Sequence, residues 1–179
     1  STASSYPDVP VDLMCATSDT SCTNRAPSFF TTRLLRSVTA TQWTGSNWAY
    51  VDRVELGYRY PAPGDGTDPA LWLDRIRRTG LAGGSQVLPD ITFDGVGMDN
   101  RVDTTSVNLP LRHYRVNRIV GELGSETKVT YGQVGLTCDK AALPTADSNA
   151  RMCFPRIWTP GSGPAGFGWF HKYVVTSVA

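Results

Sequence analysis

The apolar residues between positions 51 and 100 fall into three short runs separated by loops. In the first run the apolar side chains recur mostly at every second position, and Asp52 interrupts the alternation; the apolar members are Tyr50, Val54, Leu56, Tyr58 and Tyr60. This period predicts a β-strand with these side chains on one face, because successive side chains of a strand point to opposite faces of a sheet. The loop at residues 61–69 holds three prolines and two glycines, which a helix interior does not tolerate. The stretch therefore predicts strand, loop, strand, loop, strand in an antiparallel meander.

A first hairpin is predicted at the start of this stretch. Residues 29–43 are rich in β-branched side chains and end at the turn sequence TGSN, which leads into the strand at residues 48–60. A helical stripe of Phe30, Leu34 and Val38 is the competing interpretation of the same run. We predict a strand, because valine and threonine favour it.

Residues 70–79 carry signals for both a helix and a strand. Asp68-Pro69 is typical of a helix start, since aspartate caps a helix and proline fits its first position. The segment is short, however, and stops at a glycine. We therefore predict a strand here as well.

Two further strand signals follow. Residues 86–98 predict a strand in which Gly95 and Gly97 favour a bulge or the close approach of another backbone. Residues 113–133 predict a second hairpin around the turn sequence LGSE, and the apolar character of both faces of its first strand suggests that the strand is covered on both sides.

The pattern as a whole predicts an all-β fold of mainly antiparallel strands in a layered sheet or sandwich, with long Pro/Gly-rich loops. We expect an extended N-terminal segment at residues 1–28 and a meander core at residues 29–134. Residues 135–179 are expected to complete the same domain, with an irregular disulfide-linked loop to residue 168 and a terminal strand at residues 169–178.

Composition narrows the range of partners. The net charge is +1 and charged residues make up 18% of the chain, so no broad field attracts nucleic acid or an anionic membrane. No run approaches the roughly 18 apolar residues that a membrane span needs. The sequence shows no signal peptide, so a secreted protein is expected to be represented here by a mature or excised segment.

The four cysteines form one close pair near each end of the chain. Neither spacing matches the short Cys-x-x-Cys knuckles of zinc sites. We predict two local disulfides, Cys15–Cys22 and Cys138–Cys153, and hence an oxidising compartment. Four buried thiols in a cytosolic domain remain the alternative.

The sequence offers only weak candidates for a set of catalytic residues. There is no Gly-x-Ser-x-Gly elbow, and the Gly161-Ser162-Gly163 sequence lies in a Pro/Gly loop with no helix after it. His113 and His171 could be drawn into a Ser-His-Asp triad, but His171 lies in an apolar strand and is expected to be a packed, hydrogen-bonded ring. The sequence therefore predicts no catalytic residue.

Two groups of side-chain oxygens are weak candidates for a calcium site. Asp65 and Asp68 offer two carboxylates in a tight loop, and Asp99, Asn100 and Asp103 offer a second set of oxygens. Neither run follows an EF-hand or a repeat-type calcium loop. Turn formation, in which aspartate caps its own backbone, is the competing interpretation.

Tryptophans supply the candidates for ligand binding. Most of the five are expected in the core of a β-layered domain, but some could form an aromatic platform for a glycan or a peptide. Trp158, in an IWTPGSG loop, is the best candidate for a contact surface; Trp48 and Trp72 are the others. The cluster of Arg75, Arg77 and Arg78 is interpreted as an ion-paired face, because acidic residues balance it.

Three phrases carry a resemblance to a known family. LWLDRIRRTG followed by LPDITFDGVGMDNRVD resembles a strand-and-Asn-Arg-Val-Asp pattern of secreted actinobacterial RHS/YD-repeat proteins. RIVGELGSETKVTYGQ resembles the unit that precedes their YD repeats, and CFPRIWTP followed by WFHKYVVTSV resembles a further block of the same proteins. The phrases stand in the family's order over residues 33–178.

The resemblance implies a segment upstream of the repeat array. Proteins of this class resemble the Tc-toxin B/C cocoon and teneurins, which are large β-rich shells around a C-terminal toxin or effector. The chain lacks the tandem YD repeats and the Asp-Pro-x-Gly motif associated with self-cleavage, so no catalytic residue is carried over.

We therefore expect a non-catalytic structural module, secreted or on the cell surface, without a cofactor. Its expected partners are the remainder of its own polypeptide, meaning the YD-repeat shell and the effector. The alternative is an extracellular carbohydrate-binding or adhesion module.

Overall fold

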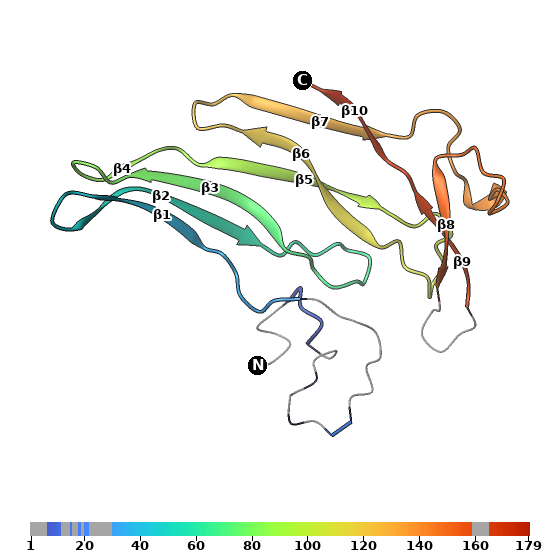
Figure 1. Ribbon diagram of the computed structural model, residues 1–179. Helices are drawn as coiled ribbons and strands as arrows, with labels where there is room; N and C mark the ends of the chain where they lie inside the picture. Colours follow the sequence, from blue (N-terminus) through green and yellow to red (C-terminus); the bar gives the residue numbers. More distant parts are fainter. Residues whose placement is uncertain (1–6, 12–14, 16–17, 19, 22–29, 159–164) are drawn as a thin grey trace. The chain divides into compact units, whose positions relative to one another are not determined.

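The computed structural model describes residues 7–11, 15, 18, 20–21, 30–158 and 165–179. Within these residues the regular elements are ten strands and one 3-10 turn, Lys140–Ala142. The strands are β1 Ser37–Trp43, β2 Trp48–Arg59, β3 Trp72–Gly80, β4 Gln86–Val87, β5 Ile91–Asp99, β6 Arg112–Val120, β7 Glu126–Gly132, β8 Cys153–Trp158, β9 Gly166–His171 and β10 Val174–Val178 (Figure 1). The all-β prediction is confirmed, and so are both hairpins and the strand at residues 70–79.

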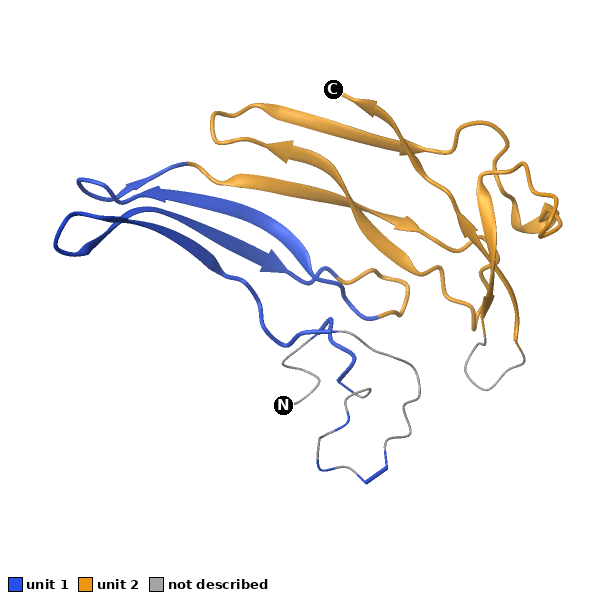
Figure 2. Ribbon diagram, viewed as in Figure 1, with its two compact units in different colours: residues 1–61, 68–88 blue, residues 62–67, 89–179 orange. Residues whose placement is uncertain are grey.

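The chain divides into two compact units (Figure 2). Unit 1 comprises residues 1–61 and 68–88, and unit 2 comprises residues 62–67 and 89–179. The strand pairings within each unit are antiparallel.

Unit 1 contains β1 to β4. β1 and β2 are joined by a four-residue turn in which Thr44 N donates to Asn47 O at 2.9 Å, and Gly45 adopts a φ of 99° that favours glycine. β2 pairs with β3, and the two residues of β4 also pair with β3. β1 is therefore an outer strand of this sheet.

The predicted face of β2 is partly wrong. An irregularity in the β1–β2 register leaves Val51 as an extra residue on β2, because Ala40 lies opposite Asp52 and Thr41 lies opposite Tyr50. An extra residue shifts the alternation by one, so Tyr50 lies on the opposite face from Val54. Tyr50 is accordingly exposed, whereas Val54 is half buried.

Unit 2 contains β5 to β10. β5, β6 and β7 form a meander, and β10 returns to pair with β7, which makes β10 an outer strand. β8 and β9 form a hairpin of their own. The β5–β6 register shifts between Asp94 and Gly95, but the extra residue is Asn117 on β6 and neither of the glycines at which the sequence predicts a bulge.

A small apolar core lies at the β8–β9 hairpin. Cys153 is fully buried and packs with Val102, Cys138 and Trp169. The predicted Cys138–Cys153 disulfide is confirmed, with Cα atoms 5.9 Å apart. The bond ties the start of β8 to the loop that follows β7.

The N-terminal cysteines are only partly described. Cys15 is disulfide-bonded, whereas Cys22 lies outside the described residues. The Cys15–Cys22 pairing stays a prediction.

The start of the first strand was predicted too early. β1 begins at Ser37, and residues 30–36 form no strand. Arg33 N donates to Thr31 Oγ1 at 3.1 Å, a local bond of the kind that competes with a sheet ladder. The β-branched composition of this segment therefore did not make it a strand.

The C-terminal region is more regular than predicted. Residues 135–168 include β8 and the start of β9, and the run at residues 169–178 is two strands with different partners. Lys172, the first residue after β9, donates its N–H to Met152 O at 2.9 Å, and the chain then pairs with β7 from Val174 onward. Pro155 is tolerated in β8 because β8 pairs with β9 on one side and, among the described residues, has no strand partner on its other side, where the N–H that proline lacks is not needed.

Candidate functional site

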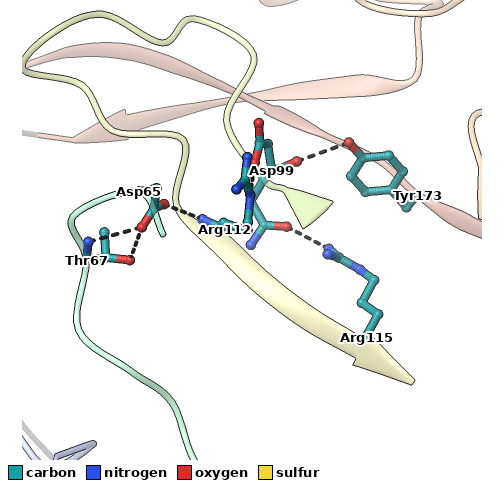
Figure 3. Close-up of polar contacts among 7 residues, drawn as sticks. Asp65, Thr67, Asp99, Arg112, Arg115 and Tyr173 are labelled. Carbon is teal, nitrogen blue, oxygen red and sulfur yellow. Dashed lines mark hydrogen bonds and ion pairs between the residues drawn. The ribbon is translucent and has the colours of Figure 1, made fainter. Parts of the chain in front are cut away.

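A polar cluster of unit 2 lies where β5 ends and β6 begins (Figure 3). We call it the Asp99 cluster; its members are Asp65, Thr67, Asp99, Asn100, Arg112, Arg115 and Tyr173. They come from the loop at residues 61–69, from the end of β5 and the residue after it, from β6, and from the link between β9 and β10. The cluster therefore joins segments that are distant in sequence.

Asp65 fastens the Pro/Gly loop to β6. Its Oδ2 accepts from Arg112 N at 2.7 Å, and its Oδ1 accepts from the N and Oγ1 of Thr67 at 3.0 and 2.6 Å. Burial acts to raise the pKa of Asp65, but the hydrogen bonds from Arg112 N–H and from Thr67 outweigh it and hold the pKa below its usual value. Both carboxylate oxygens are thus engaged by the chain itself.

The same region holds an ion pair and a strained residue. Arg112 Nε donates to Asp99 Oδ1 at 2.6 Å, and this hydrogen bond raises the pKa of Arg112. Gly97 leaves room for that side chain, because a Cβ there would lie 2.9 Å from Arg112 Cδ. Leu111 has a φ of 53°, a left-handed conformation that is uncommon for leucine. The N–H of the next residue, Arg112, is the one that Asp65 Oδ2 accepts.

Asn100, Arg115 and Tyr173 complete the cluster. Arg115 Nη2 donates to Asn100 Oδ1 at 2.6 Å, and its guanidinium carbon lies 5.0 Å from the centre of the Tyr173 ring. Tyr173 Oη donates to Asp99 O at 3.1 Å, and burial raises the pKa of Tyr173. Two arginines are thus held by oxygen and ring partners within the fold.

His171 is a packed histidine beside this cluster. Its Nδ1 lies 3.0 Å from Gln133 Nε2, which also donates to Met152 O at 2.8 Å. The amide is the donor, so Nδ1 accepts and the ring proton of the neutral form sits on Nε2. Burial lowers the pKa of His171. Among the described residues its ring nitrogen is bonded to an amide rather than to a nucleophilic hydroxyl or thiol.

Arg101 pairs with Phe170 of β9 through the backbone, and its side chain lies against aromatic rings of the β8–β9 hairpin. It is 2% exposed, and its guanidinium carbon lies 4.2 Å from the centre of the Trp158 ring and 5.1 Å from that of Phe170. Its three side-chain nitrogens lack hydrogen-bond partners, although Asp103 Oδ1 lies 3.8 Å from Nε. A Cβ on Gly168 would lie 2.8 Å from Trp158 Nε1, so this glycine makes space for the stacked ring.

The predicted ligand-binding tryptophans have three different environments. Trp158 is half buried and stacks on Arg101. Trp72, the first residue of β3, is only 9% exposed. Trp48 is 65% exposed, and its ring centre lies 5.5 Å from that of Trp43. Trp43, Trp48 and Tyr50 share one exposed face of the β1–β2 hairpin.

The calcium site predicted at Asp65 and Asp68 stays a prediction. Asp65 belongs to unit 2 and Asp68 to unit 1. Among the described residues no group of three or more His, Cys, Asp or Glu side chains could hold a metal ion. The contacts of Asp65 match the turn interpretation, in which an aspartate caps nearby backbone N–H groups.

Sequence reasoning missed Arg101, Arg112, Arg115 and Tyr173. The sequence carried a signal only for Asp65 and Asp68 in the loop, because arginines on strands are expected to be solvated until the residues that pair with them are known.

No protein-family model matches the chain, and neither a curated protein nor a solved structure matches it. In the described part of the chain no helix is long and apolar enough to cross a membrane.

Proposed function

We propose that the chain is a non-catalytic structural β-module of a secreted RHS/YD-repeat protein. It contributes to a shell or support that encloses or displays a C-terminal effector. Its partner is the rest of its own polypeptide. The three family-like phrases motivate this proposal, and the disulfide between Cys138 and Cys153 is compatible with an oxidising environment.

Strand β10 is the single observation that carries the proposal. All five of its residues are exposed, three of them are valines, and the strand contains no charge and no proline. Self-sufficient domains usually protect an outer strand with charged residues or proline. The irregularity between Val175 and Ser177 is the one protective feature of β10. An outer strand such as β10 needs no stronger protection against unwanted pairing when further strands of the same polypeptide continue the sheet at its edge.

The polar groups support a structural role. The Asp99 cluster uses its carboxylates and guanidinium groups in contacts that join a loop, two strands and a strand link. His171 is held neutral by burial and by an amide partner. These groups hold segments together, and their arrangement offers no paired nucleophile and base.

The test mixes the purified chain with the YD-repeat region encoded in the same reading frame. Light scattering coupled to gel filtration measures the mass of the complex. We expect a one-to-one complex with the wild type and its loss in the double variant Val175→Lys, Val178→Lys, because two charges then line the edge. Val107→Lys is the matched control, since Val107 is 82% exposed in a loop of the same unit.

Two results would contradict the proposal. One is a reading frame without YD repeats. The other is a complex that forms equally well with lysines on β10, because that result places the contact elsewhere.

Glycan binding is the second candidate, and the exposed aromatic face of unit 1 favours it. Trp43, Trp48 and Tyr50 present ring surface of the kind that stacks on apolar sugar faces. A glycan array with the wild type tests this role. Trp48→Ala is expected to lose about tenfold in affinity, or about 1.4 kcal/mol, whereas Phe167→Ala, an exposed ring on β9, is not. An array without a bound glycan would exclude the candidate.

A further inference from the structure

Among the described residues, strand β1 is an outer strand that lacks the usual edge protection. It pairs with β2, all seven of its residues are exposed, and its sequence SVTATQW contains no charge, proline or glycine. The extra residue of the β1–β2 irregularity lies on β2, so β1 itself keeps a regular edge. A long uncharged edge of this kind is a template for another strand.

The pairing with β2 shows which backbone groups at the start of β1 face outward. Leu56 N donates to Arg36 O at 2.8 Å, so Arg36 faces β2. The backbone groups of an antiparallel strand alternate between its two sides. Ser37 and Thr39 therefore direct their N–H and C=O groups to the open side.

The same alternation applies at the other end of β1. Thr44 N donates to Asn47 O at 2.9 Å, so Thr44 faces β2. Counting back from this residue, Trp43 and Thr41 direct their backbone groups to the open side. Within the part of the chain that the structure describes, the open edge thus offers four residues with unpaired backbone groups, at every second position from Ser37 to Trp43.

We propose that two copies of this chain pair through β1 in an antiparallel arrangement with Ala40 on the two-fold axis. In this register Thr39 of one copy lies opposite Thr41 of the other, and Ser37 lies opposite Trp43. Each outward-facing residue then meets an outward-facing residue, which is the geometry of hydrogen-bonded antiparallel pairs. A register shifted by one residue would lose that match.

The side chains of β1 suit this register. Cross-strand Thr–Thr pairs are favourable, and no like charges oppose one another because β1 carries none. The small Ser37 leaves space for Trp43 of the second copy. The arrangement is two-fold and therefore closes as a dimer. It concerns unit 1 and stands independently of the role proposed for β10.

Sedimentation of the full chain between roughly 1 μM and roughly 1 mM tests the pairing, and we expect a reversible dimer in the wild type. Two charged double variants then test the register. Thr39→Glu with Thr41→Lys sets opposite charges across the interface, and Thr39→Glu with Thr41→Glu sets like charges. We expect the like-charged variant to weaken the dimer by about tenfold or more and the opposite-charged variant to keep it. Thr39 pairs with Arg53 on β2, so glutamate has the same neighbour in both variants.

A cross-linking experiment gives a second measurement. The described residues include no free cysteine, so Ala40→Cys adds a thiol whose partner in the dimer is its own symmetry copy. Cα atoms of such non-hydrogen-bonded pairs lie about 4.5 Å apart, within the range for a disulfide. We expect a covalent dimer after mild oxidation, and none from the control Gln42→Cys, which faces Val38 of the second copy.

Each remaining outcome contradicts the proposal. A wild type that stays monomeric throughout the range overturns it and leaves β1 for a strand of another protein. Equal behaviour of the two charged variants, or equal cross-linking at positions 40 and 42, places the interface or its register elsewhere. Circular dichroism of each variant checks that the strands still form.

Discussion

Removing the Cys138–Cys153 disulfide is expected to destabilise unit 2 strongly. The change is Cys138→Ala with Cys153→Ala. The bond spans a sequence separation of 15 residues, and closing a loop of that length lowers the entropy of the unfolded chain by an amount equivalent to about 3 kcal/mol. Alanine is preferred to serine because Cys153 is fully buried, and a hydroxyl there would lack a partner.

The expected loss translates into a measurable shift of the unfolding midpoint. A change of 1 kcal/mol moves the midpoint of a chain of about this length by about 2–4 °C, so about 3 kcal/mol corresponds to about 6–12 °C. Calorimetry of the oxidised wild type and the variant measures it. Hydrogen exchange should show the loss of protection in β8, in β9 and in residues 136–146, because the disulfide and the apolar core lie there.

The double variant keeps Cys15 in its own bond, so the effect reports one disulfide. Ser106→Ala with Val107→Ala is the matched control in an exposed loop of the same unit. A loss below about 1 kcal/mol would refute the loop-closure reasoning. Loss of protection confined to β1, β2 and β3 would contradict the assignment of the bond to unit 2.

Three further predictions concern single side chains. Glu126 is expected to titrate with a pKa of about 2, because Arg118 and the neighbouring Lys128 donate hydrogen bonds to its carboxylate. NMR titration measures this pKa, and Arg118→Gln should move it back toward 4.5. Since that folded pKa is depressed, its stabilising effect is present above about pH 4.5 and is lost as the pH falls toward 2. Burial lowers the folded pKa of His171, so its contribution is present above the unfolded value of 6.5 and is lost as the pH falls through the folded one. Unfolding midpoints at about pH 7.5 and about pH 5.5 should show a smaller difference in His171→Gln than in the control His113→Gln, and equal differences would contradict this. Gly97→Ala is expected to lower the free energy of unfolding by about 1–3 kcal/mol, because the added methyl group crowds the side chain of Arg112. Chemical denaturation measures this change, and an unchanged free energy would show that the Arg112 side chain can move aside.

The strands were predictable because their signals are local. β2 alternates over most of its length, and the turn sequences TGSN and LGSE separate the strands of both hairpins. Apart from residues 30–36, where a local hydrogen bond competes with the ladder, the failures came from non-local contacts. The extra residue at Val51 depends on the partner strand, so the sequence could not place Tyr50 on its correct face. The change of partner between β9 and β10 is invisible in a continuous β-forming run.

The candidate site was predictable only in part. Asp65 stood out because a loop of Pro, Gly and Asp is a turn signal, and its role as a cap follows from that chemistry. Its bond to Arg112 joins residues 47 positions apart, and the bond of Tyr173 to Asp99 joins residues 74 apart. Such contacts depend on the sheet register. The stacking of Arg101 on Trp158 likewise needs the backbone pairing of Arg101 with β9.

Hydrogen exchange at β10 tests the central claim most directly. The amides of Val174–Val178 are measured in the isolated chain and again in the whole polypeptide that contains it. If β10 is the edge at which further strands continue the sheet, its outward-facing amides should exchange more slowly in the whole polypeptide by about tenfold or more. Unchanged exchange at these amides would contradict the account.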